Sequence, residues 1–351
     1  MIHRLAILCV TLHNTFLPHR EKGKGDAHLL TVSRLRSVWP ALLLGVLLLT
    51  ATTAESHADE DFSPEVPLLS EQFGEDPMYS LPEQTWQPEI RETVHQDSTW
   101  GWWLLPEGLL YKSYVAGEKE PRFSSAFLAE QGGDVLWDSV LGGRVGLVRY
   151  GTQRGIQPEG VQLDIEGGAF VRLLPTEERD VQAVDFRMGV PLTYREGPFQ
   201  AKFGYYHISS HLGDEFLLKN PGFDRINYVR DAFVIGVGYF PIDSLRLYAE
   251  ASWAFFTGRE GAPWDFQTGL EWGSPEPTAI YGSPFFAMNV LLREETDWSG
   301  SLNVLAGWQW RGFTSDHVFR AGLQYFTGKN NQYSFTQDNQ TLIGAGIRYD
   351  Y

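Results

Sequence analysis

The stretch that decides the fold is residues 245–255, which read Leu-Arg-Leu-Tyr-Ala-Glu-Ala-Ser-Trp-Ala-Phe. Apolar side chains stand at every second position from Leu245 to Phe255, and Arg246 and Glu250 fall between them. Successive side chains of a β-strand point to opposite faces, so this period of two predicts a strand with one apolar and one polar face. Whether the apolar face meets a protein core or lipid depends on the rest of the chain.

The same alternation recurs from residue 121 onward, with turn residues between the segments. We expect twelve strands, at about 121–129, 135–150, 160–172, 181–194, 198–211, 229–241, 244–257, 263–274, 284–293, 300–311, 316–327 and 341–351. Their connections alternate in length. The short ones are 195–198, 241–244 and 312–315, and the longer ones are 211–228, 257–263, 294–299 and 328–340.

Antiparallel strands of this kind build either a soluble sandwich, with the apolar face inward, or an outer-membrane barrel, with the apolar face toward lipid. Three features favour the barrel. The strands reach the ~9–11 residues needed to cross a membrane, charges of both signs such as Asp164 and Arg187 stand at mid-strand, and short turns alternate with longer loops. The sequence therefore predicts an all-β fold, an antiparallel transmembrane β-barrel of about 12 strands with an N-terminal periplasmic extension and its short turns on the periplasmic side.

The C-terminal stretch supports this prediction. Apolar and small side chains alternate through residues 341–351, and the chain stops on Tyr351. This pattern resembles the terminal strand that outer-membrane assembly machinery recognises in bacterial barrels. The resemblance implies the barrel-assembly machinery as a partner, and the barrel itself implies outer-membrane lipids. We expect the last strand to pair with both the eleventh and the first, because lipid leaves no backbone group unsatisfied.

The N-terminus has the pattern of a secretory signal. Arg34 and Arg36 precede an apolar run from Val38 to Leu49, and small residues follow up to Ala58. We predict a signal peptide with a long n-region over residues 1–58, which directs the protein to the bacterial outer membrane. The alternative is a short membrane anchor, but the run falls short of the ~20 residues that span a bilayer.

Residues 59–120 are predicted to form an acidic periplasmic leader ahead of the barrel at 121–351. Three tryptophans near its end, Trp100, Trp102 and Trp103, indicate either an anchor at the membrane interface or a small core plug. The net charge of −16 excludes nucleic acid as a partner, because no basic stripe is available to follow phosphates. Cys9, the only cysteine, lies in the predicted signal peptide, so a mature chain has no disulfide or thiolate metal site.

The candidate chemistry lies in residues 205–211, Tyr-Tyr-His-Ile-Ser-Ser-His. His207 and Ser209 are two residues apart and therefore share one face of a strand, the face predicted to meet lipid. A hydroxyl beside an imidazole is the pair that a nucleophilic hydrolase needs, and a third group must orient the imidazole. Candidates for that group are Asp214, Glu215, Asp224, Asn227 and Asp231. The alternative is an ordinary polar rim without catalysis.

Residues 206–209, with Asp214 and residues 225–227, resemble the catalytic region of outer-membrane phospholipase A, and lipid A deacylase has a similar His-x-Ser. The resemblance implies a serine acyl hydrolase that uses His207, Ser209 and Asn227, with calcium nearby. Ser210 and His211 stand where the phospholipase has Asn-Gly, and the loop to Asn227 is longer. By overall pattern the chain resembles an uncharacterised bacterial family of secreted outer-membrane barrels, for which residues 207–215 are typical and which implies no activity.

Asp214 and Glu215 are the candidate calcium ligands, because calcium prefers hard oxygen donors. The alternative is that they belong to a solvated acidic loop. The sequence thus leaves two functions open. One is a lipid or ester hydrolase acting at the outer leaflet, and the other is a non-enzymatic structural barrel or narrow channel. A twelve-stranded barrel encloses a modest interior that side chains and the leader could fill.

Overall fold

The computed structural model describes residues 99–153, 157–313 and 316–351. The predicted signal peptide, and the predicted leader up to residue 98, lie outside these residues. The strands are β1 (Gly101–Leu104), β2 (Phe123–Glu130), β3 (Val135–Gly151), β4 (Gly160–Leu174), β5 (Asp180–Glu196), β6 (Phe199–Leu212), β7 (Val229–Ile242), β8 (Leu245–Thr257), β9 (Trp264–Gly273), β10 (Ser283–Arg293), β11 (Gly300–Arg311), β12 (Val318–Lys329) and β13 (Asn339–Asp350). Short helices α3 (Asp214–Lys219), η3 (Glu294–Thr296) and η4 (Tyr333–Phe335) lie in loops.

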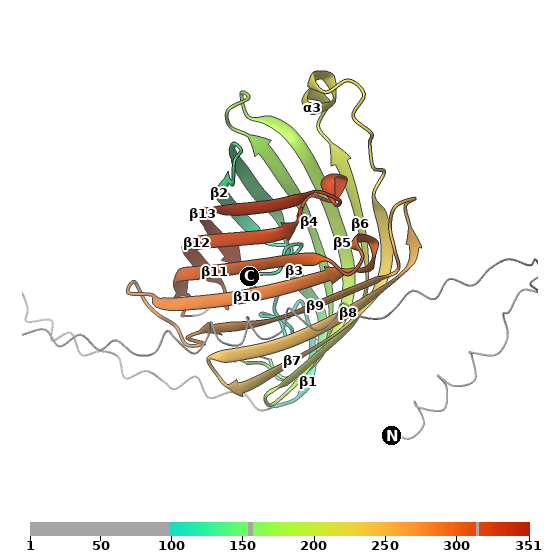
Figure 1. The fold of residues 1–351 in the computed structure, drawn as a ribbon. Coiled ribbons are helices and arrows are strands. Elements are labelled where there is room, and N and C mark those ends of the chain that lie inside the picture. The colour runs from blue at the N-terminus through green and yellow to red at the C-terminus, as the bar shows by residue number, and fades with distance from the viewer. Residues whose placement is uncertain (1–98, 154–156, 314–315) are drawn as a thin grey trace, which may run out of the picture. The chain divides into compact units, whose positions relative to one another are not determined.

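Strands β2 to β13 form a closed antiparallel barrel of twelve strands (Figure 1). Each pairs with its neighbours in the chain, and β13 closes the barrel by pairing with both β12 and β2, as the Ile347↔Ser125 register shows. The predicted fold class is confirmed, and so is the expected pairing of the last strand. The short strand β1 was not predicted, and it pairs with the end of β3 through Gly101↔Gly151.

The alternation seen in the sequence is an alternation between lipid and lumen. On β8 the side chains of Leu247, Trp253 and Phe255 are 41%, 43% and 51% exposed, whereas those of Arg246 and Tyr248 are 3% and 4% exposed. An apolar outer surface around a polar interior is the arrangement of a barrel in lipid and the reverse of a soluble sandwich. The chain is therefore a transmembrane β-barrel of the outer-membrane type. In the described part of the chain, no helix is long and apolar enough to cross a membrane.

The two ends of the barrel differ. At one end, named here the turn end, residues 197–198 connect β5 to β6 and residues 243–244 connect β7 to β8. At the other, the loop end, residues 213–228 carry α3 and residues 330–338 carry η4. Gly197 has φ +54°, a backbone conformation that favours glycine in so tight a turn. Short and long connections do not alternate strictly between the two ends, because the longer connection 274–282 also lies at the turn end. We expect the turn end to face the periplasm.

Residues 105–122, named here the luminal segment, run inside the barrel between β1 and β2 (Figure 1). Leu110, Tyr111, Tyr114 and Ala116 are each 0% exposed. Residues 105–120, which belong to the predicted leader, therefore lie inside the barrel. The physical reason is that the polar wall supplies bonding partners that the sequence of the segment alone does not reveal.

The tryptophans before the luminal segment meet the outer edge of β3. The Trp103 indole donates a hydrogen bond to the Gly151 carbonyl at 2.9 Å. Trp102 is 74% exposed and its ring lies 5.0 Å from that of Tyr150. This exposed aromatic pair matches the interface anchor better than the core plug, and the plug is formed by the residues that follow.

Candidate functional site

The main chain of the luminal segment is held by side chains of the barrel wall. Arg149 donates to the carbonyls of Glu107 and Gly108, each at 2.9 Å, and Gln200 donates to the Leu110 carbonyl at 2.8 Å. Further bonds of this kind join Arg144 to the Tyr111 carbonyl (2.9 Å), Arg246 to the Lys112 carbonyl (3.0 Å) and Asn303 to the Ala116 carbonyl (2.8 Å). These wall side chains satisfy carbonyls that would otherwise be buried without partners.

Charged and aromatic side chains of the luminal segment also bind the wall. Lys112 Nζ lies 2.6 Å from Asp316 Oδ2, and Lys119 Nζ lies 2.6 Å from Asp185 Oδ2. The Tyr114 ring stacks on that of Tyr248 with 3.9 Å between centroids. Asp316 lies at the turn end and Asp185 lies toward the loop end. The luminal segment therefore extends through most of the length of the barrel.

A second insertion closes the loop end. The loop at residues 330–338 folds inward, so that Tyr333 is 5% exposed. The Tyr333 amide donates to Asp185 Oδ2 at 3.1 Å, and the Arg293 guanidinium lies 4.8 Å from the Tyr333 ring. Arg172 donates to Asn331 Oδ1 at 2.7 Å. The sequence indicated only a longer connection here, whereas the structure places its middle inside the barrel mouth.

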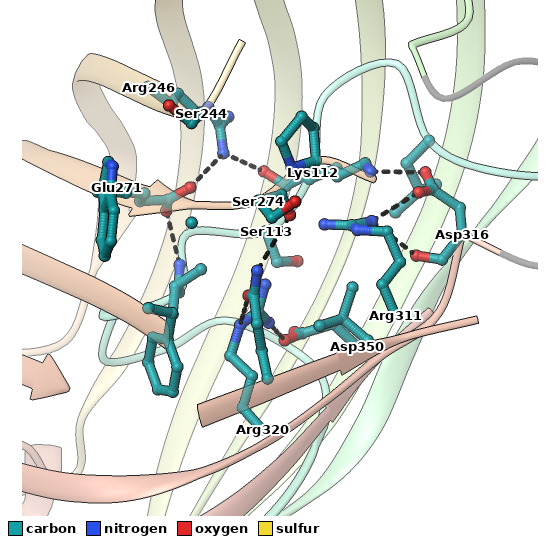
Figure 2. A pocket seen from close by; sticks show the side chains of 18 of the residues that line it. Lys112, Ser113, Ser244, Arg246, Glu271, Ser274, Arg311, Asp316, Arg320 and Asp350 are labelled. Carbon is teal, nitrogen blue, oxygen red and sulfur yellow. Dashed lines mark hydrogen bonds and ion pairs between the residues drawn. The ribbon is translucent and has the colours of Figure 1, made fainter. Parts of the chain in front are cut away.

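A cavity of about 110 Å³ remains at the turn end, between the luminal segment and the wall. Figure 2 shows charged side chains around it, and their ion pairs join the walls of the cavity. Arg246 Nη1 lies 3.3 Å from Glu271 Oε2, and Arg311 Nη1 lies 2.8 Å from Asp316 Oδ1. Sequence analysis did not identify this site, because its lining residues come from nine different strands and from the luminal segment.

On the outer surface, the predicted His207 is hydrogen-bonded to a carboxylate. Strands β6 and β7 place His207 opposite Asp231, with His207 Nδ1 2.9 Å from Asp231 Oδ1. The Tyr205 hydroxyl donates to the same oxygen at 2.6 Å. A carboxylate at Nδ1 favours the tautomer with its proton there, which leaves Nε2 as the basic nitrogen. The His–Asp bond is the orienting contact that nucleophilic hydrolases use.

The other predicted site residues make no hydrogen bond to His207 within the described part of the chain. Ser209 lies on the same outward face as His207, but its hydroxyl makes no hydrogen bond with any described residue. Asn227 is exposed in the loop before β7, and its side chain is likewise without a hydrogen bond to the described residues. His211 is exposed, with its ring edge toward Phe186. The structure thus pairs His207 with Asp231, which sequence analysis considered among several candidates.

The predicted calcium ligands occupy the first turn of α3. Asp214 and Glu215 are both exposed there. Across residues 99–153, 157–313 and 316–351, no group of three or more His, Cys, Asp or Glu side chains is placed to hold a metal ion. Calcium needs six to eight oxygen ligands, so this pair alone does not fit a calcium site and we derive no chemical step from one.

Comparison with known families identifies the chain. A family model described as "Protein of unknown function (DUF1207)" matches residues 77–351. The chain belongs to the DUF1207 family. This confirms the predicted membership of an uncharacterised family of barrels, and the matched range includes the luminal segment as well as all the barrel strands. No curated protein matches this DUF1207 chain.

Several solved outer-membrane barrels are similar to this DUF1207 protein in fold. A KdgM porin in complex with disordered oligogalacturonate has a TM-score of 0.39 and 9% identity, with 65% of this chain and 98% of the porin covered. Outer membrane phospholipase A from Escherichia coli has a TM-score of 0.40 and 11% identity, with coverages of 65% and 90%. An anion-selective porin from Comamonas acidovorans has a TM-score of 0.30 and 12% identity, with coverages of 66% and 97%. Likenesses this distant carry no inference about activity.

Proposed function

We propose that this DUF1207 protein is a non-enzymatic conduit of the outer membrane that is closed at rest by its own luminal segment. The observation that supports this proposal is the hydrogen bonding of the segment's carbonyls to Arg149, Gln200, Arg144, Arg246 and Asn303. These bonds are polar and can be exchanged for bonds to water. Departure of the segment would also expose two small apolar clusters, Tyr111 and Tyr114 with Tyr248, and Val115 and Ala116 with wall residues such as Phe285.

The wall would remain a polar path after such a movement. Among the wall charges, Asp185 pairs with Lys119 of the segment and Asp316 pairs with Lys112. If the barrel were only a scaffold, its inward charges could be paired across the wall alone. Asp185 and Asp316 instead pair with lysines of a segment that is not part of the wall, and this supports a gate. When the segment leaves, water replaces the lysines as partners and the lumen keeps a charged, hydrated lining.

The test is whether the segment moves. Ala116 is fully buried, and Cys9 lies in the predicted signal peptide, so Ala116→Cys introduces a single thiol into a mature barrel. We expect a water-soluble maleimide to label it slowly in purified protein, and faster under voltages that produce conductance steps in planar bilayers. The control is Ser299→Cys in an exposed loop, which should label at once. A silent bilayer at every voltage, together with an Ala116→Cys thiol that stays unlabelled for hours, would favour a permanently closed scaffold.

A second candidate function rests on the 2.9 Å hydrogen bond between His207 Nδ1 and Asp231 Oδ1. In this reading the protein is an acyl hydrolase at the outer leaflet, with Ser209 as nucleophile, His207 Nε2 as base and Asp231 as the group that orients the imidazole. An aspartate on an outward face near lipid costs free energy unless it is paired or used. The Ser210 amide is already bonded to the Tyr228 carbonyl at 3.0 Å, so an oxyanion donor would have to come from elsewhere.

The hydrolase reading predicts that Ser209→Ala lowers acyl release from phospholipid vesicles by roughly a thousandfold, because the nucleophile is lost. Asp231→Asn should also lower the rate by a large factor, since the amide favours the wrong imidazole tautomer. Asn227→Ala is the matched comparison. If Asn227→Ala abolishes release while Asp231→Asn does not, Asn227 orients His207 after all. Wild-type protein without acyl release, with or without calcium, removes this candidate function.

A further inference from the structure

The turn-end cavity is bounded by basic side chains from several strands. Its lining includes Lys112, Arg195, Arg246, Arg311 and Arg320, and most of these are seen around the open space in Figure 2. The cavity volume of about 110 Å³ is several times as large as the ~10–15 Å³ that one water needs by the same measure. It therefore has room for a small polar ligand.

Several guanidinium N–H groups in this lining have no hydrogen-bond partner. Arg195 Nε, Arg246 Nε, Arg246 Nη2 and Arg311 Nε are buried and unpaired among the described residues. Arg195 is 1% exposed and Arg246 is 3% exposed. Leaving a buried charged donor unpaired is costly, so this concentration of free donors at one cavity indicates a ligand that accepts hydrogen bonds.

The carboxylates at the cavity are already shared. Asp316 lies within 2.6 Å of Lys112 and 2.8 Å of Arg311. Glu271 accepts from Arg246 and also from the Val115 amide, the latter at 2.7 Å. Two buried carboxylate oxygens at the cavity, Asp316 Oδ2 and Asp350 Oδ1, accept no hydrogen bond from the described residues. Each is nevertheless in an ion pair, the first with Lys112 at 2.6 Å and the second with Arg122 at 3.4 Å.

Arg195 has no carboxylate partner of its own. Among the described residues, no Asp or Glu oxygen lies within 4.0 Å of a guanidinium nitrogen of Arg195, the limit for an ion pair. Its side chain donates to the Gln157 side chain and lies 4.8 Å from the Phe240 ring. Asp243 also lines the cavity, but it is exposed on the turn between β7 and β8. The buried lining consequently carries more positive than negative charge.

We propose that the turn-end cavity is a binding site for a small oxyanion such as phosphate, held by Arg195, Arg246 and Arg311. The planar guanidinium group presents paired N–H donors that match the oxygens of a phosphate or carboxylate. Binding there requires neither movement of the luminal segment nor chemistry at His207. The inference therefore stands apart from both functions proposed above.

The test uses the full mature chain in detergent, with inorganic phosphate titrated calorimetrically at constant ionic strength. Arg195→Gln removes a donor that makes no hydrogen bond or ion pair with the described residues of the luminal segment. We expect it to weaken phosphate binding roughly tenfold to a hundredfold. The matched control is Arg172→Gln, which removes the same charge from a buried position near the loop end and should leave phosphate affinity unchanged.

A second pair of variants keeps the test decisive if Arg195→Gln does not fold. Ser244 lines the cavity and makes no side-chain hydrogen bond with the described residues. Ser244→Asp places a fixed anion beside the arginines and should reduce phosphate binding below detection, whereas Ser244→Asn should bind as the wild type does. Heat-modifiable migration on a denaturing gel verifies folding. The proposal is overturned if wild-type protein binds no phosphate at millimolar concentration, or if Arg195→Gln or Ser244→Asp binds it unchanged.

Discussion

Replacing residues 107–118 with a glycine–serine linker of equal length is expected to turn a silent barrel into a conducting one. The change removes the Tyr114 ring stacked on Tyr248 and the Lys112 ammonium paired with Asp316. A flexible linker also no longer holds its carbonyls in place for Arg149, Gln200 and Asn303. Because β1 and β2 are kept, the closed sheet persists. Water then fills the lumen, and the wall arginines become its lining. Single-channel recording in planar bilayers measures the result as discrete steps.

The insertion at the loop end determines how large those steps are. Tyr333 stays bound to Asp185 and Arg293 in the first variant, so we expect small, intermittent steps. Replacing residues 331–337 as well should give larger and steadier ones. The control replaces the exposed residues 218–222 by the same kind of linker and should remain silent. A folded double replacement that never conducts would show that the wall side chains alone close the barrel, and the conduit proposal would be wrong.

The sequence was sufficient to predict the wall of the barrel. Each wall strand carries its own evidence, because the apolar and polar faces alternate within one segment, as Leu247 and Arg246 do on β8. That periodicity depends on local geometry and on the choice between lipid and lumen. It does not depend on knowing any partner strand. The closure of β13 onto β2 followed from the requirement that no backbone group in lipid stays unpaired.

The luminal segment was not predicted, because its bonds are to residues distant in the sequence. Leu110 is bonded to Gln200 and Ala116 to Asn303, contacts that span 90 and 187 positions. Without a period of its own, the segment resembles the acidic leader that precedes it. One local signal was present, since Tyr111, Tyr114 and Val115 are large aromatic or apolar residues close together in the sequence, which a solvated leader does not require.

The hydrogen-bond partner of His207 could not be predicted from the sequence either. Asp231 and Asn227 are both plausible by composition, and only the register of β6 against β7 decides between them. That register depends on how residues 213–228 fold, because a shift of one residue moves every side chain of a strand to the other face. The outward placement of His207 and Ser209, in contrast, followed from the strand period alone. The arginine cavity had no sequence signal, since its members are single residues at separate strand ends.

The second large effect concerns the C-terminus. Deleting Tyr349 to Tyr351 is expected to abolish accumulation of the barrel in the outer membrane. Tyr349 pairs with Phe319 on one side and Phe123 on the other, so its loss opens the seam at which the barrel closes. The deletion also removes Asp350, which forms ion pairs with Arg122 and Arg320. Leaving buried arginines without a carboxylate costs about 3–5 kcal/mol.

Two comparisons separate the causes of such a loss. Asp350→Asn keeps the strand and both tyrosines, and we expect a barrel that inserts in cells but unfolds at a lower temperature. The truncated chain is also refolded in detergent without any assembly factor. If it becomes heat-modifiable there but not in cells, the terminal aromatic residues act through recognition by the assembly machinery. Failure in both settings would assign the effect to closure of the β2–β13 seam. A truncated chain that still accumulates in cells as a compact, heat-modifiable species would show that neither role is required, because the remaining pairs from Leu342 to Arg348 then suffice to close the barrel.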